Sequence, residues 1–141
     1  MVEQEVITEK IKFLTEYIAD LEEKQDISLE NFINDKMLRR YIERTFHLAI
    51  ECCLDIGSHI ISSERLREPE DNKDIFVVLV ENKYLPATDL DNLKRMAQFR
   101  NLVVHSYSRI DPVILYGILQ NNVPDLKKFA RNVKDKLLPQ L

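Results

Sequence analysis

The sequence predicts an all-α protein, a single domain over residues 1–141 that folds as an antiparallel up-and-down bundle of about five to six helices. Three observations predict this fold. Apolar residues recur every three or four positions through most of the chain, which is the spacing of one helical face. No segment alternates apolar with polar residues as a half-buried strand does. At 141 residues the chain has the size of one domain with short connections.

The first half of the chain predicts two long helices. The first carries a stripe at alternating steps of four and three, formed by Ile7, Ile11, Leu14, Ile18 and Leu21. The second is expected to begin at Ser28, because serine is a good N-cap and Glu30 would follow in the first turn. Its stripe of Leu38, Ile42, Ala49, Cys52, Ile56 and Ile60 continues to residues 62–72, which predict a loop.

Residues 75–80 are apolar at every position, which fits a buried strand or a short buried helix equally well. After them, Thr88 and Asp91 form a weak capping box, and the apolar spacing predicts a helix over residues 89–106.

Two proline signals predict the last two helices. Asp111 before Pro112 is typical of an N-cap and a first helical residue, and predicts a short helix through Leu119. Pro124 opens the final helix, whose inward residues are Leu126, Phe129, Val133 and Leu137.

Composition excludes several classes of protein. Only two glycines occur, Gly57 and Gly117, so the chain has no glycine-rich loop of the P-loop or Rossmann kind. Cys52 and Cys53 are adjacent, which suits neither a disulfide nor a metal clip, and we expect both as core thiols in a reducing compartment. No apolar run approaches the roughly 18 residues of a membrane span. We therefore expect a cytoplasmic protein with no membrane contact.

Charge is unevenly distributed along the chain. The formal net charge is −4, which argues against a generally basic nucleic-acid coat. Residues 1–35 hold ten acidic and three basic residues, a net −7, which leaves +3 for residues 36–141. The second part of the chain can therefore still form a local anion-binding surface.

A polar series at steps of four follows the second helix, formed by Glu43, His47, Glu51, Asp55 and His59. Such a series could suggest a di-metal bundle. A step of four drifts about 40° round a helix, however, and no matching Glu-x-x-His occurs elsewhere in the chain. The series therefore favours a polar seam or a solvated face, and neither a metal ion nor a cofactor is expected.

Residues 98–112 carry the strongest chemical signal. Arg100, His105 and Tyr107 bring a permanent cation, a group that titrates near neutrality and a phenol to one helix end. These groups suit phosphate chemistry, although a core histidine with a capping arginine fits the same residues. On a straight helix Arg100 and His105 lie about 140° apart, so the two would converge more easily across a two-fold interface.

The string R-N-L-V-V-H-S-Y resembles the R-x-x-x-x-H-x-Y signature of HepT-like HEPN ribonuclease toxins. Two longer stretches extend the resemblance: LRRYIERTFHLAIECCLDIG at residues 38–57 and LKRMAQFRNLVVHSYSRIDP at residues 93–112. The resemblance implies an all-helical HEPN domain, with a helix rather than a strand at residues 75–80. It also implies a homodimer whose two motifs face one cleft.

The resemblance further implies a role for each residue of the motif. Arg100 and His105 would be the catalytic pair of a metal-independent endoribonuclease, the toxin of a type VII toxin–antitoxin pair. Tyr107 would be the residue to which a partner, a minimal nucleotidyltransferase antitoxin, attaches AMP. Contacts to the RNA backbone are expected from Lys94, Arg95, Asn101 and Arg109. The alternative is a non-catalytic HEPN module that docks and assists a nucleotidyltransferase.

Overall fold

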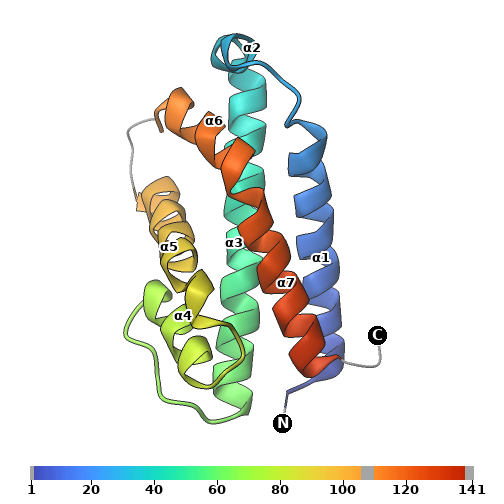
Figure 1. Ribbon diagram of the computed structural model, residues 1–141, viewed down its shortest axis with the longest axis vertical. Helices are drawn as coiled ribbons and strands as arrows, with labels where there is room; N and C mark the ends of the chain where they lie inside the picture. The colour runs from blue at the N-terminus through green and yellow to red at the C-terminus, as the bar shows by residue number, and fades with distance from the viewer. Residues whose placement is uncertain (1, 106–109, 139–141) are drawn as a thin grey trace.

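The computed structural model describes residues 2–105 and 110–138, and for residues 104 and 105 it describes the backbone alone. Every regular element in these ranges is helical (Figure 1). The elements are α1 (Gln4–Glu23), α2 (Leu29–Asn34), α3 (Lys36–Ser63), α4 (Asn72–Glu81), the short 3-10 helix η1 (Ala87–Asp89), α5 (Leu90–His105), α6 (Pro112–Asn121) and α7 (Val123–Leu137). The all-α expectation is confirmed.

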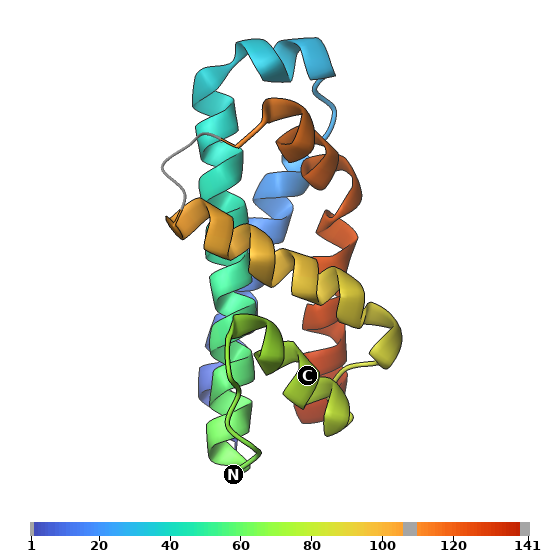
Figure 2. The ribbon, with the colours of Figure 1, turned by 90° about the vertical axis from the view of Figure 1, so that its left-hand side faces the viewer.

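Helix α3 is the central element of the bundle, and α1, α4, α5 and α7 all pack against it. Figure 1 shows α1 and α7 on one side of α3 and α4 and α5 on the other, with α1 and α3 antiparallel. The turned view in Figure 2 shows α5 crossing α3 obliquely.

The stripe predicted for α1 is buried along its whole length, and Cys52 and Cys53 are free thiols in the core, as expected. Burial raises the pKa of both thiols, most strongly for Cys53.

The predicted second helix is two helices, so the described part of the chain has seven α-helices rather than five or six. The expected start is correct: the Ser28 hydroxyl accepts from the backbone N–H of Asn31 at 3.1 Å. The chain then leaves the helix at Asp35, whose carboxylate accepts from the N–H of Leu38 at 3.0 Å and caps α3. A short polar side chain at this point satisfies the open donors of a new helix, and the direction of the chain changes.

Residues 75–80 are helical, as the family resemblance implied, and form most of α4. Close packing of α4 on α3 depends on Gly57. A Cβ atom added at Gly57 would lie 2.6 Å from Cγ2 of Ile75 and 3.2 Å from Cδ1 of Leu79. The glycine therefore permits the two helices to approach closely.

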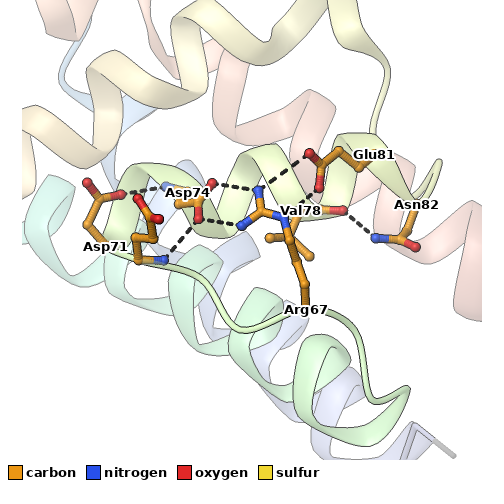
Figure 3. Close-up of polar contacts among 7 residues, drawn as sticks. Arg67, Asp71, Asp74, Val78, Glu81 and Asn82 are labelled. Atoms are coloured by element: carbon orange, nitrogen blue, oxygen red, sulfur yellow. Dashed lines mark hydrogen bonds and ion pairs between the residues drawn. The ribbon is translucent and has the colours of Figure 1, made fainter.

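The loop between α3 and α4 is fastened by Arg67. Figure 3 shows its guanidinium between the carboxylates of Asp74 and Glu81, at 2.7–2.8 Å from both. Asp74 also accepts from the backbone N–H of Glu70 at 2.9 Å, and Asp71 caps the start of α4. The hydrogen bonds from Arg67, together with the one from the backbone N–H of Glu70, lower the pKa of Asp74 to about 2.

Helix α5 begins at Leu90, one residue after the expected start, and η1 directly precedes it. Helix α6 begins as expected: the Asp111 carboxylate accepts from the N–H of Val113 at 2.8 Å. Three hydrogen bonds then fasten α6 to the turn after α1. Tyr116 donates to the Ile27 carbonyl at 2.7 Å, Gln120 donates to the Gln25 carbonyl at 2.7 Å, and Gln25 donates to the Leu119 carbonyl at 2.9 Å. These bonds hold α6 against the end of the bundle that carries α2.

Candidate functional site

Helix α5 carries Arg100 to the seam with α3. The buried face of α5 includes Leu93, Met96, Ala97 and Phe99. The Phe99 ring meets Phe46 of α3 edge to face, with ring centroids 6.1 Å apart. The next residue, Arg100, lies at the edge of this buried face and contacts Glu51 of α3.

Arg100 is held by two side chains. Its Nε donates to Oε1 of Glu51 on α3, and its Nη1 donates to Oδ1 of Asn101 at 3.3 Å. The same Asn101 oxygen accepts from Asn72, the first residue of α4, at 3.1 Å. The guanidinium is therefore oriented by three helices, α3, α4 and α5, which are fixed by core packing.

His47 extends this contact along α3. Its Nε2 lies 3.6 Å from Oε1 of Glu51, and its Nδ1 lies 3.0 Å from Nη1 of Arg44. Arginine can only donate, so Nδ1 must be the acceptor and the ring proton lies on Nε2, facing Glu51. Burial lowers the pKa of His47, and the charges of Arg44 and Arg100 lower it further, against the opposing effect of Glu51. His47 is therefore neutral near pH 7.

The polar series on α3 divides between two neighbours, as the drift of a step of four predicts. His47 and Glu51 face α5 and Arg100. Farther along, Asp55 pairs with Lys10 of α1 at 3.5 Å, and His59 accepts from the backbone N–H of Glu3 at 3.3 Å. Within the described ranges, no three side chains of the metal-ligating types gather to hold a metal ion.

The other expected site residues have different positions. Arg95 is exposed and donates to Asn92 at 3.0 Å, while Asn92 donates to the buried carboxylate of Asp125 on α7 at 3.2 Å. Arg95 therefore lies beside Asn92, the residue through which α5 meets Asp125 of α7. Lys94 is half-buried, on the side of α5 near Asp74.

Three expected residues lie outside what the structure describes: the side chain of His105, and the whole of Tyr107 and Arg109. The sequence analysis did not assign Glu51 or Asn72 to the site. Glu51 belonged to the polar series at steps of four, which was the signal that could have indicated it. Asn72 gave no signal, because it lies 29 residues from Asn101 in the chain.

Exposed apolar side chains lie beside the motif. Leu102 near the end of α5 is 49% exposed, and Val113 and Ile114 at the start of α6 are 54% and 59% exposed. These three residues flank residues 106–109 in the sequence. In the described part of the chain, no helix is long and apolar enough to cross a membrane.

A helical bundle with Arg-x4-His at the end of one helix, and the arginine held at the seam with the central helix, defines a HEPN domain. The family model described as ribonuclease HepT-like matches residues 14–133, and the chain belongs to this family.

Relatives agree with this assignment. The mRNA nuclease HepT of Shewanella oneidensis is 29% identical over 111 residues, which are 79% of this chain and 77% of that protein. The tRNA nuclease HepT of Aphanizomenon flos-aquae is 21% identical over 97% of this chain and 93% of its own. A solved structure of the tri-AMPylated Shewanella oneidensis HEPN toxin in complex with the MNT antitoxin is 27% identical and superposes with a TM-score of 0.85, covering 94% of this chain and 99% of that one.

Proposed function

We propose that this chain is the toxin of a toxin–antitoxin pair, a metal-independent endoribonuclease that acts as a cytoplasmic homodimer. We also propose that a partner nucleotidyltransferase neutralises it by attaching AMP to Tyr107. The observation that carries the proposal is the R-x-x-x-x-H-x-Y sequence at the end of α5, with Arg100 oriented in the α3–α5 seam. Membership of a ribonuclease family and the AMPylated state of the Shewanella relative support it.

The chemistry follows from the substrate. RNA carries its own nucleophile, the 2′-hydroxyl, which attacks the adjacent phosphorus while the 5′-oxygen leaves. The reaction needs a base for the 2′ proton, an acid for the 5′-oxygen and positive charge for the phosphorane. His105, or its two copies in a dimer, supplies the base and the acid, and Arg100 supplies the charge. The products are a 2′,3′-cyclic phosphate and a 5′-hydroxyl.

A second protomer would complete the cleft. Arg100 and His105 are five residues apart in the sequence, and positions with this spacing lie about 140° apart round an ideal helix. The exposed apolar side chains of Leu102, Val113 and Ile114 support pairing of two copies beside the motif. Pairing there would bring the two copies of the motif to one phosphate.

RNA is proposed here as a class of substrate, because one relative is named for mRNA and the other for tRNA. We propose that Lys94, Arg95, Asn101 and Arg109 contact the RNA backbone. Among those whose side chains the structure describes, Arg95 is exposed, and its described contact is with Asn92 rather than with a carboxylate. Its guanidinium is therefore available to a phosphate. The cytoplasmic location is supported by the two free core thiols, which are typical of a reducing compartment.

RNA cleavage by the purified chain tests the nuclease. We expect cleavage in EDTA, a mass near twice 16.7 kDa by sedimentation, and a loss of about 10²–10⁴-fold in rate for His105→Ala. A requirement for Mg²⁺, a monomer that cleaves at the full rate, or full activity of His105→Ala would each contradict the mechanism. A chain that binds the nucleotidyltransferase but never cleaves RNA would be the docking module instead.

Incubation with the nucleotidyltransferase, ATP and Mg²⁺ tests the switch at Tyr107. We expect intact mass to rise by one or more AMP units and cleavage to stop, because the phosphodiester of the adduct would occupy the cationic site as an RNA phosphate does. Tyr107→Phe should cleave RNA, gain no AMP and escape inhibition. If the partner silences Tyr107→Phe as fully as the wild type, inhibition works by docking alone.

A further inference from the structure

We propose that Glu51 of α3 is a positioning residue for RNA cleavage, which fixes the guanidinium of Arg100 in the orientation that meets the scissile phosphate. The inference rests on the proposed ribonuclease function and adds a residue from outside the R-x-x-x-x-H-x-Y motif. It is carried by the contact between Glu51 and the Nε of Arg100, two groups 49 residues apart in the chain.

The first step is the geometry of the arginine. A guanidinium has five N–H donors in one plane, and a phosphate binds best to two parallel donors on one edge. Glu51 takes the Nε donor and Asn101 takes one Nη1 donor, so two different nitrogens of the group are bound. Two such bonds fix both the plane and the rotation of the group. The edge that faces a phosphate is therefore set before RNA arrives, which is the condition for electrostatic stabilisation without reorganisation.

The second step is the support of Glu51 itself. The Nε2–H of His47 faces the Glu51 oxygen that Arg100 uses, and Arg44 donates to the other ring nitrogen of His47. Arg44 thus donates to His47, and the ring N–H of His47 faces Glu51. Arg100 donates to the same carboxylate. The Glu51 oxygen that meets Arg100 therefore also lies against His47 of the same helix.

The third step is the local charge. Arg44 and Arg100 each carry +1, Glu51 carries −1 and His47 is neutral, so these four side chains sum to +1. The carboxylate therefore orients Arg100 while the cluster as a whole still attracts an anion. A second carboxylate at this point would cancel that attraction.

Steady-state cleavage of a short RNA by Glu51→Ala and Glu51→Gln tests the proposal, with Asp55→Asn as the matched control one turn farther along α3. We expect Glu51→Ala to lower kcat by about 10–100-fold, with KM changed less than about threefold, because a misplaced group costs rate rather than binding. Glu51→Gln keeps an oxygen acceptor for Nε and should restore most of kcat. Asp55→Asn, which loses only the exposed contact with Lys10, should match the wild type.

A second measurement reads the contact without relying on activity. In 15N-labelled protein, the Nε–H resonance of Arg100, assigned by its loss in Arg100→Lys, should exchange slowly with water. It should disappear in Glu51→Ala and persist in Glu51→Gln and Asp55→Asn. Persistence in Glu51→Ala would show that the carboxylate does not hold the arginine, and would overturn the proposal even if that variant were unstable.

The remaining outcomes separate this proposal from the function on which it rests. Wild-type kcat in Glu51→Ala, together with an inactive Arg100→Ala, would leave the proposed function standing and overturn the positioning role. A loss confined to KM would make Glu51 a binding residue, and equal losses in Glu51→Ala and Glu51→Gln would point to charge rather than position. Full activity of Arg100→Ala would remove the proposed function of the arginine and the role of Glu51 with it.

Discussion

Arg67 and Arg100 both bind carboxylates, yet their surroundings differ. Arg67 lies on the surface between Asp74 and Glu81, with 43% of its side chain exposed. Arg100 lies in the α3–α5 seam, where 23% of its side chain is exposed, and meets the single carboxylate of Glu51. Two carboxylates exceed the charge of one guanidinium, and so a further anion gains little at Arg67.

The two sites also differ in what they join. Arg67 fastens a loop to the outer face of α4, where water screens the ion pairs and their net contribution to stability is small. Arg100 stands where three helices meet, and its carboxylate is shared with His47. From this comparison we expect function to follow the charge that the surrounding residues leave uncancelled, rather than the number of arginine–carboxylate contacts.

The largest expected effect separates the two arginines by activity. Arg100→Ala should lower RNA cleavage by about 10²–10³-fold, the usual cost of removing one group that stabilises transition-state charge. Arg67→Ala should cleave at the wild-type rate. Both variants should keep the helical circular dichroism of the wild type. Equal losses of activity in the two variants would contradict the distinction between the two arginines.

A second expected effect, of intermediate size, concerns stability on the α4 side of α3. Alanine at Gly57 would collide with Ile75, whereas a Cβ at Gly117 meets no atom within 4 Å. Both substitutions gain the same helix propensity over glycine, so the overpacking should place Gly57→Ala about 1–3 kcal/mol below Gly117→Ala in free energy of unfolding. Urea denaturation measures the difference. Equal stability of the two variants would mean that α3 and α4 do not need the glycine.

The smallest expected effect is on acid stability. The pKa of Asp74 is lowered to about 2, so the carboxylate stabilises the fold above its ordinary pKa near 4, and that stabilisation is lost as pH falls toward 2. Arg67→Ala should raise this pKa toward its ordinary value. The gap in thermal midpoint between wild type and variant should therefore be present at pH 6 and shrink between pH 4 and pH 2. A gap independent of pH would show that the ion pair contributes nothing.

Local signals predicted most of the fold. The α1 stripe and the Asp111–Pro112 start depend on spacing and capping, which neighbouring residues determine. The break at Asp35 was missed because it lies ahead of the apolar stripe that begins at Leu38, and capping by one aspartate leaves no mark on apolar spacing. Residues 75–80 could not be assigned from periodicity, since helices and strands that are buried all round have the same uniform apolar pattern.

The candidate site was predicted in part. The sequence makes Arg100 a candidate because it lies within a short motif, while the carboxylate that binds it, Glu51, was seen only as one member of a polar series. Which members of that series face α5 depends on the rotation of two helices, set by contacts such as Phe46 with Phe99. Contacts of this kind join distant parts of the chain, and spacing within one segment does not contain them.

The two buried cysteines make this protein convenient for site-directed labelling. A thiol reacts as its thiolate, and burial with a raised pKa keeps Cys52 and Cys53 protonated and out of reach of maleimides. A cysteine introduced at Met37, which is 76% exposed, would therefore take a spin label alone. Each chain would carry one label at a known place on α3. The distance between two labels would then report directly how two copies pair in solution.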